Sequence, residues 1–252
     1  MTFPLMKSTA WAPLGFALLL LGLWQGAVKA LGIPEYLLPA PTAIMAAVDP
    51  SLARQLGVTF LEAFAGFAMA SAIAFVAALL FARFRLLENG LFPLAIALKT
   101  TPIVAIAPLL VIWLGTGWWS KIVAAMLICF FPVLVNTVKG LKAADLEYRE
   151  LFATMGATNM QEFAKLRIPY CLPYFFSALK ISASLAVIGA IVGEFVGSTQ
   201  GLGYLIVISS AHLETPTLFT AIIAAASIGI VLFYAIGWTE RRLVFWQAGD
   251  GE

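Results

Sequence analysis

The stretch DLEYRELFATMGATNMQEFAKLRIP occupies residues 145–169 and is the longest charged, amphipathic passage in an otherwise apolar chain. Four apolar residues in its first half recur at the spacing of one helical face, which predicts a short surface helix. They are Tyr148, Leu151, Phe152 and Met155. Arg149 and Glu150 turn to the other side of this helix.

The second half of the stretch predicts a glycine elbow followed by another short helix. Gly156 comes directly after the last periodic residue, where a left-handed backbone favours glycine. Thr158 and Gln161 have the spacing of a capping box, so a second helix begins there. This helix should end before Pro169, because the proline ring disfavours helical geometry at Ile168.

These residues carry a family resemblance. Glu150, Gly156 six residues later and, after nine more residues, the run LRIP at 166–169 resemble the cytoplasmic EAA loop of binding-protein-dependent ABC importers. The two consensus alanines are Leu151 and Phe152 here, which departs from the family pattern. In that family the loop docks into a groove on the ATPase subunit. The alternative is an amphipathic loop that lies on the membrane surface.

The resemblance implies a set of residues that contact the ATPase. They are Tyr148, Glu150, Leu151, Phe152, Met155, Gly156, Ala157, Thr158, Leu166, Ile168 and Pro169.

The composition is that of an integral membrane protein. Of the 252 residues, 62% are hydrophobic and 11% are charged, whereas soluble domains carry roughly 25% charged residues. A net charge of +2 without a long basic run gives no basis for nucleic-acid binding.

Six stretches have the length and composition of membrane-spanning helices, which predicts an all-α membrane protein. They are residues 11–30, 57–82, 91–113, 121–138, 172–195 and 217–238. The proline-containing segment at 31–56 is too polar to span and should lie at the surface with one interfacial helix. The first stretch also resembles a secretory signal ending at Ala30, but its length favours an uncleaved helix.

The basic residues predict the orientation, because cytoplasmic loops hold the excess of lysine and arginine. With the N-terminus inside, ten of the fifteen basic residues face the cytoplasm, three face outside, and two lie in or near spans. The ten are Lys7, Arg83, Arg85, Lys139, Lys142, Arg149, Lys165, Arg167, Arg241 and Arg242. The three are Lys29, Arg54 and Lys121, and the two are Lys99 and Lys180. Both termini and residues 145–169 are therefore expected in the cytoplasm.

The third span is unusual because it places a cation, two hydroxyls and prolines within the membrane. These residues are Lys99, Thr100, Thr101, Pro102 and Pro108. Prolines kink helices and free backbone carbonyls, here that of Leu98, which predicts a helix that lines a wet cavity. The alternative is that Lys99 snorkels or braces the kink.

Glu194 lies near the outer end of the fifth span and is expected either at the mouth of the path or in a structural hydrogen bond. The following run contains Gly197, Gly201 and Gly203 and resembles a family passage beside the outer gate, although a plain turn would look similar. Glu62, early in the second span, is expected at the outer interface. The expected pathway residues are Lys99, Thr100, Thr101, Pro102, Glu194, Gly201 and Gly203.

Several kinds of site have no basis in the sequence. There is no phosphate-binding loop and no cytoplasmic segment long enough for a nucleotide-binding domain. The one histidine, His212, has no second histidine or cysteine beside it for a metal, and no catalytic partner. Cys129 and Cys171 are expected to be free thiols. The chain is thus expected to be a transport subunit and not an enzyme.

The resemblance covers nearly the whole chain and implies a single permease domain at 1–252, similar to type I ABC importers, with its coupling loop at about 139–171. It implies a multi-pass protein of the cell inner membrane. Its partners would be two ABC ATPase subunits, a second permease copy, an extracytoplasmic solute-binding protein and the lipid bilayer. ATP and magnesium would be held by the ATPase, and this chain would bind no cofactor.

The implied solute is a small anion of the nitrate, sulfonate, taurine or bicarbonate type, or a heterocycle like a pyrimidine or riboflavin. Passages such as LPAPTAI and VGEFVGSTQGLGYLI carry this part of the resemblance. The alternative function is a self-sufficient channel or an ion-coupled secondary transporter. Such proteins generally place ionisable residues at the midplane and often show two related halves, and no convincing repeat is visible here.

Overall fold

The structure is a computed structural model that describes residues 11–247, apart from the side chains of Arg85 and Leu98. The described residues form helices joined by turns, with no strand among them. Within residues 11–247, five long helices are apolar enough to cross a membrane. They are α1 (Trp11–Ala30), α3 (Ser51–Arg83), α6 (Trp118–Lys142), α9 (Ile168–Phe195), to which the preceding turns from Asn159 are joined, and α11 (Thr215–Leu243). The all-α membrane architecture is confirmed.

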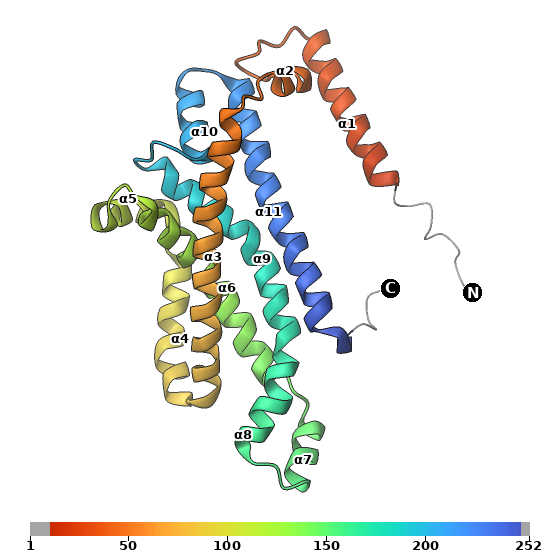
Figure 1. Ribbon diagram of the computed structural model, residues 1–252, viewed down its shortest axis with the longest axis vertical. Helices are drawn as coiled ribbons and strands as arrows, with labels where there is room; N and C mark the ends of the chain where they lie inside the picture. Colours follow the sequence, from red (N-terminus) through yellow and green to blue (C-terminus); the bar gives the residue numbers. More distant parts are fainter. Residues whose placement is uncertain (1–10, 248–252) are drawn as a thin grey trace, which may run out of the picture.

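Helices α3, α6 and α9 form the centre of the bundle, and α6 packs extensively against the other two (Figure 1). Small residues allow the close approach. A Cβ on Gly66 would lie 2.6 Å from the carbonyl oxygen of Ile122, and a Cβ on Gly189 would lie 2.6 Å from the Cα of Ala125. Membrane helices use such positions because backbone packing replaces the hydrophobic effect within lipid. Fully buried alanines continue these contacts, among them Ala63, Ala70, Ala74, Ala124, Ala183 and Ala186.

The predicted third span is broken into two helices and not merely kinked. Helix α4 (Arg85–Thr100) and helix α5 (Ile103–Leu114) have 16 and 12 residues, so each is shorter than a spanning helix of about 20. Pro102 adopts an extended conformation between them. A proline disfavours helical geometry in the residue before it and offers no N–H, which explains why the helix stops here.

The two ends of the bundle carry different short elements (Figure 1). One end holds α7 (Leu146–Thr154) and α8 (Asn159–Glu162). The opposite end holds α2 (Pro41–Ala46), the one short helix expected in the 31–56 segment, and the apolar helix α10 (Leu202–Ala211). The last described turn is the 3-10 helix η2 (Phe245–Gln247).

Helix α1 stands beside the bundle, as Figure 1 shows, and contacts it near one end. The ring of Trp24 lies 5.8 Å from that of Phe219 on α11, and the Gln25 amide donates to Thr42 on α2. Most of its other large apolar side chains are exposed within this chain. Cys129 and Cys171 are buried free thiols in α6 and α9, as predicted.

Candidate functional site

The elbow after α7 has the left-handed glycine that the sequence predicts. Gly156 has a φ of 71°, and a Cβ there would meet nothing within 4 Å, so the backbone conformation alone selects glycine. The N–H groups of Gly156 and Ala157 donate to the carbonyls of Ala153 and Phe152, which closes the end of α7. The turn therefore reverses the chain in a defined direction.

The predicted capping box at the start of α8 is present. The Thr158 hydroxyl accepts from the N–H of Gln161, and the Gln161 side chain accepts from the N–H of Thr158. Two backbone donors that would otherwise lack partners are thus satisfied within the turn.

An ion pair across the elbow fixes the two helices to each other. One oxygen of Glu162 accepts from Nε of Arg149 at 2.8 Å and from Nε of Arg167 at 3.0 Å. Arg149 belongs to α7, whereas Arg167 ends the turns that follow α8. The sequence pattern did not reveal this bridge, because a helical face says nothing about contacts between residues on opposite sides of a turn.

The predicted helix stop before Pro169 is wrong. Residues Phe163–Arg167 form a π-helical turn, η1, and the helix continues through Pro169 into α9. In the π turn the N–H of Ile168 bonds the carbonyl of Phe163, one residue further back than in an α-helix. Pro169 then falls in the first turn of α9, where a missing N–H is tolerated.

The apolar stripe of α7 is exposed. Helix α7 has no buried residue, and the exposed fractions of Tyr148, Leu151 and Met155 are 50%, 54% and 75%. Phe152 is half-buried, and Met160 on α8 adds a further exposed apolar side chain. Glu150 and Thr158 are exposed beside the stripe, whereas Ala157, Leu166, Ile168 and Pro169 are half-buried. This pair of helices, joined by the Glu162 ion pairs, thus presents apolar surface that no described part of the chain covers.

A second candidate site lies at the break between α4 and α5. A cavity of about 330 Å³ is lined there by Lys99, Thr100, Thr101 and Pro102, together with residues of α6 and α9. The Lys99 ammonium lies 4.9 Å from the centre of the Phe131 ring. The hydroxyls of Thr100 and Thr101 both donate to the carbonyl of Ala97, which places this acceptor beside the break.

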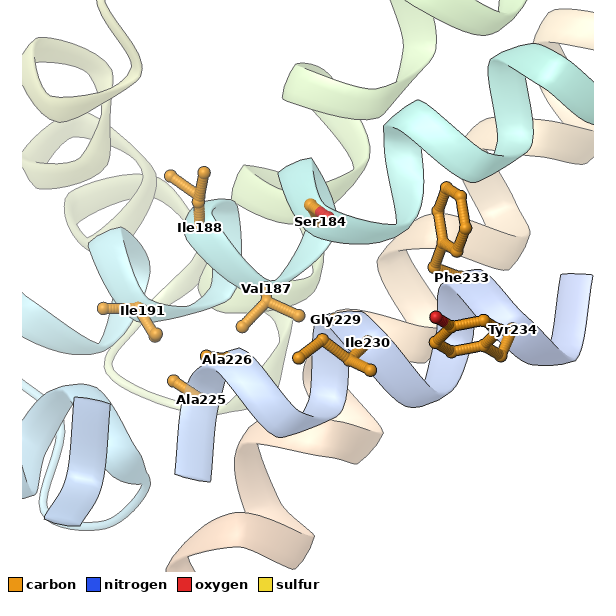
Figure 2. A pocket seen from close by; sticks show the side chains of 10 residues that line it. All are labelled: Ser184, Val187, Ile188, Ile191, Ala225, Ala226, Gly229, Ile230, Phe233 and Tyr234. Atoms are coloured by element: carbon orange, nitrogen blue, oxygen red, sulfur yellow. The ribbon is translucent and has the colours of Figure 1, made fainter. Parts of the chain in front are cut away.

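A larger groove runs between α9 and α11 (Figure 2) and has a volume of about 610 Å³. Its sides are formed by aliphatic side chains of α9 and by Phe233 and Tyr234 of α11. None of its ten described lining residues is charged. The cavity at Lys99 therefore has the better chemistry for a polar solute.

A third feature is a buried polar cluster at the end of the bundle away from α7. Glu194 and Lys121 are each 1% exposed, and Glu62 is 2% exposed. Glu194 accepts hydrogen bonds from the Thr59 hydroxyl at 2.6 Å and from the N–H of Gly203. The Lys121 ammonium donates to the carbonyls of residues 116 and 117 just before α6.

The comparison with known proteins decides the family. Residues 70–245, more than half of the chain, match the family described as binding-protein-dependent transport system inner membrane component. The chain belongs to this permease family. It is a transport subunit of the inner membrane and not an enzyme.

The permease has close relatives over almost its full length. It is 38% identical over 241 residues to the formylaminopyrimidine transport permease protein ThiX of Halalkalibacterium halodurans, covering 93% of this chain and 95% of that protein. It is 36% identical over 246 residues to the riboflavin transport system permease protein RibX of Chloroflexus aurantiacus, covering 94% and 92%. A putative aliphatic sulfonates transport permease protein, SsuC of Bacillus subtilis, is 27% identical over 234 residues, covering 90% and 84%.

The fold of the permease also resembles a solved ABC transporter. The match is to the inward-facing MetNI methionine transporter, with a TM-score of 0.56 and 20% identity, over 77% of this chain and 93% of that chain. At this identity the likeness concerns the fold alone, and it supports the predicted type I architecture.

The structure divides the expected pathway residues of the permease into two groups. Residues 99–102 lie together on the cavity, whereas Glu194, Gly201 and Gly203 lie together in the buried cluster. Their place in the solute path stays a prediction.

The buried cluster also contains residues whose environment the sequence did not indicate. The sequence predicts Lys121 on the outer side and Glu62 at the outer interface, yet both side chains are buried inside the bundle. No sequence motif around Lys121 or Glu62 indicates which residues contact these side chains. His212 is exposed, and the described residues contain no group of three potential metal ligands.

Proposed function

We propose that this permease forms half of the solute path of an ATP-driven importer and binds an ATPase subunit through its coupling loop, residues 139–171. The observation that carries this proposal is the exposed apolar stripe of α7, which is oriented by the Gly156 elbow and the Glu162 ion pairs. An apolar helix face of this kind fits a groove on another protein. An isolated membrane-surface loop would not need the two helices to be fixed to each other.

The proposed assembly contains two permease copies, two ATPase subunits and one extracytoplasmic solute-binding protein. ATP and magnesium belong to the ATPase subunits in this proposal, since the sequence has no phosphate-binding loop. Two copies are expected because the cavity at Lys99 is open within one chain, and all four residues at 99–102 are exposed there. A second copy would enclose the path between the two chains.

In the proposed orientation the coupling loop and both termini face the cytoplasm. Basic residues at the ends of three helices support it, because cytoplasmic ends collect lysine and arginine. Arg83 ends α3, Lys142 ends α6, and Arg241 lies in the last turn of α11. All three helix ends point toward the end of the bundle that holds α7 (Figure 1).

The proposed solute is a planar heterocycle of the pyrimidine or flavin kind. The cavity offers the ammonium of Lys99 for a ring carbonyl or oxyanion, and the flat apolar rings of Phe130 and Phe131 for stacking. The names of the relatives at 38% and 36% identity support this class. An aliphatic sulfonate is the second candidate, because the same ammonium suits an anion and SsuC is also a relative.

The test uses proteoliposomes that contain the permease with the ATPase and binding protein of its own organism. We expect uptake of riboflavin or formylaminopyrimidine that requires both ATP on the ATPase side and the binding protein on the other side. Uptake of ethanesulfonate alone would select the second solute class. Solute flux through the permease alone, without ATP, would support the channel or secondary-transporter alternative and exclude the proposed function.

A further inference from the structure

Side chains of two other helices bind the start of α10. The N–H of Gly201 donates to the Gln55 side chain at 2.6 Å, and the N–H of Leu202 donates to the Thr59 hydroxyl at 2.7 Å. The N–H of Gly203 donates to the Glu194 carboxylate. Gln55 and Thr59 belong to α3, and Glu194 belongs to α9. The first-turn donors of a helix lack partners within that helix, so these bonds attach α10 to its neighbours.

Gly201 and Gly203 leave room for the Glu194 side chain because neither has a Cβ. Gly201 has a φ of 103°, and a Cβ on it would overlap the carboxylate group. A Cβ on Gly203 would lie 2.7 Å from the carboxylate oxygen and 2.8 Å from the Glu194 Cβ. The spacing of Gly201 and Gly203 is therefore explained by contact with a carboxylate, and a flexible turn would not require it.

Burying this cluster of ionisable side chains inside a membrane protein is unfavourable in free energy. Glu194 and its neighbour Lys121 are each 1% exposed. The carboxyl group of Glu62 interacts electrostatically with both side chains. One oxygen of Glu62 has no hydrogen-bond partner among the described residues. Buried carboxylates without full pairing destabilise a fold, so their presence indicates a role other than filling the core.

We propose that Glu194 is a positioning residue for transport, which with Thr59 and Gln55 clamps the start of α10 to α3 and α9 throughout the transport cycle. This inference rests on the proposed transport function. Opening the clamp would leave three backbone donors and a buried carboxylate without their partners at once, which is a large cost. Helix α10 therefore moves together with α3 and α9 and is not an independently hinged flap. The clamp holds the exposed side of α10, which includes Val207, in a fixed orientation at that face of the protein.

Amide hydrogen exchange of the assembled transporter measures the clamp directly. We expect the amides of Gly201, Leu202 and Gly203 to be protected both without nucleotide and with ATP and vanadate trapped on the ATPase. In Thr59→Val the Leu202 amide should exchange about tenfold faster or more. Thr59→Ser keeps the hydroxyl and should retain both the protection of the Leu202 amide and solute uptake. Thr239→Val is the matched control, because the Thr239 hydroxyl bonds only within α11 at Ala235.

Two results of the exchange experiment would overturn the clamp. Rapid exchange of these amides in one nucleotide state of the unmodified protein would overturn the proposal, since α10 would then open as a flap. Unchanged protection in Thr59→Val would also overturn it. If Thr59→Val does not fold, the two-state comparison of the unmodified protein still decides. A transporter without ATP-driven uptake would exclude the proposed function, whereas protection of the amides without nucleotide is measured independently of it.

Discussion

The ammonium of Lys99 lies 4.9 Å from the centre of the Phe131 ring. This contact joins the last turn of α4 to the middle of α6. Phe131 is far from both ends of a 25-residue helix, so this contact places the Lys99 ammonium near the middle of the length of α6. The contact also keeps the Lys99 ammonium on the wall of the cavity, so the side chain does not extend toward either end of α6.

Replacement of Lys99 by methionine should lower solute uptake while ATPase binding is unchanged. Methionine keeps a long unbranched side chain and removes the charge, so a solute oxygen loses its charged donor. Loss of such a hydrogen bond costs about 1.5–3 kcal/mol, which corresponds to about a tenfold or larger fall in uptake. Lys29→Met removes a charge from the exposed end of α1 and serves as the control. If assembly with the ATPase is lost instead, Lys99 has only a structural role.

Cysteines at positions 100 and 101 should react with a water-soluble thiol reagent in at least one state of the transport cycle. Both threonines are exposed on the cavity within this chain, so a water-filled path would reach them. The native Cys129 and Cys171 are fully buried and act as internal controls that should stay unmodified. Failure of both new cysteines to react in every state would remove residues 99–102 from the path.

The Glu162 bridge should determine how well the coupling loop is preorganised. Glu162→Gln removes the charge that Arg149 and Arg167 share, and partly exposed ion pairs contribute about 0.2–1 kcal/mol each. We expect binding of the ATPase to weaken about threefold to tenfold, as measured by titration of the purified subunits. Glu35→Gln, at an exposed site on the opposite end of the bundle, should have no effect. Equal weakening in both variants would show that the bridge has no special role.

Gly156→Val should reduce transport without preventing membrane insertion. A non-glycine residue in the left-handed conformation costs roughly 1–2 kcal/mol, and no side chain surrounds the site to produce a further clash. The elbow would then relax and reorient α7. Gly22→Val is the matched control, because that helical glycine also has open space but no positive φ. Normal ATP-driven uptake by Gly156→Val would show that the elbow geometry does not matter.

Local patterns in the sequence were sufficient for much of the coupling loop. The left-handed Gly156 and the Thr158 capping box depend only on neighbouring residues, so both could be predicted and both are confirmed. The continuation of the helix through Pro169 could not, because it depends on a π turn whose hydrogen bonds have no residue signature. The long helices were predicted from apolar length, which is independent of how they pack.

Contacts between distant residues account for what the sequence did not reveal. Thr59 and Glu194 are 135 residues apart, and nothing in either neighbourhood indicates the other. The bridge from Arg149 to Glu162 has the same origin on a smaller scale, because it crosses a turn. The prolines of the third span predict a kink, whereas the helix breaks at Pro102, where the hydroxyls of Thr100 and Thr101 bond the Ala97 carbonyl.

The dissociation constant for binding of the ATPase to the coupling loop tests the proposed function most directly. The purified permease should bind the ATPase of its own organism, and the double variant Tyr148→Ser, Met155→Ser should bind it at least about tenfold more weakly. Both side chains are exposed, so the variant should fold and insert normally. An unchanged dissociation constant in this variant, or no binding by the unmodified permease, would show that the coupling loop does not bind the ATPase through this stripe.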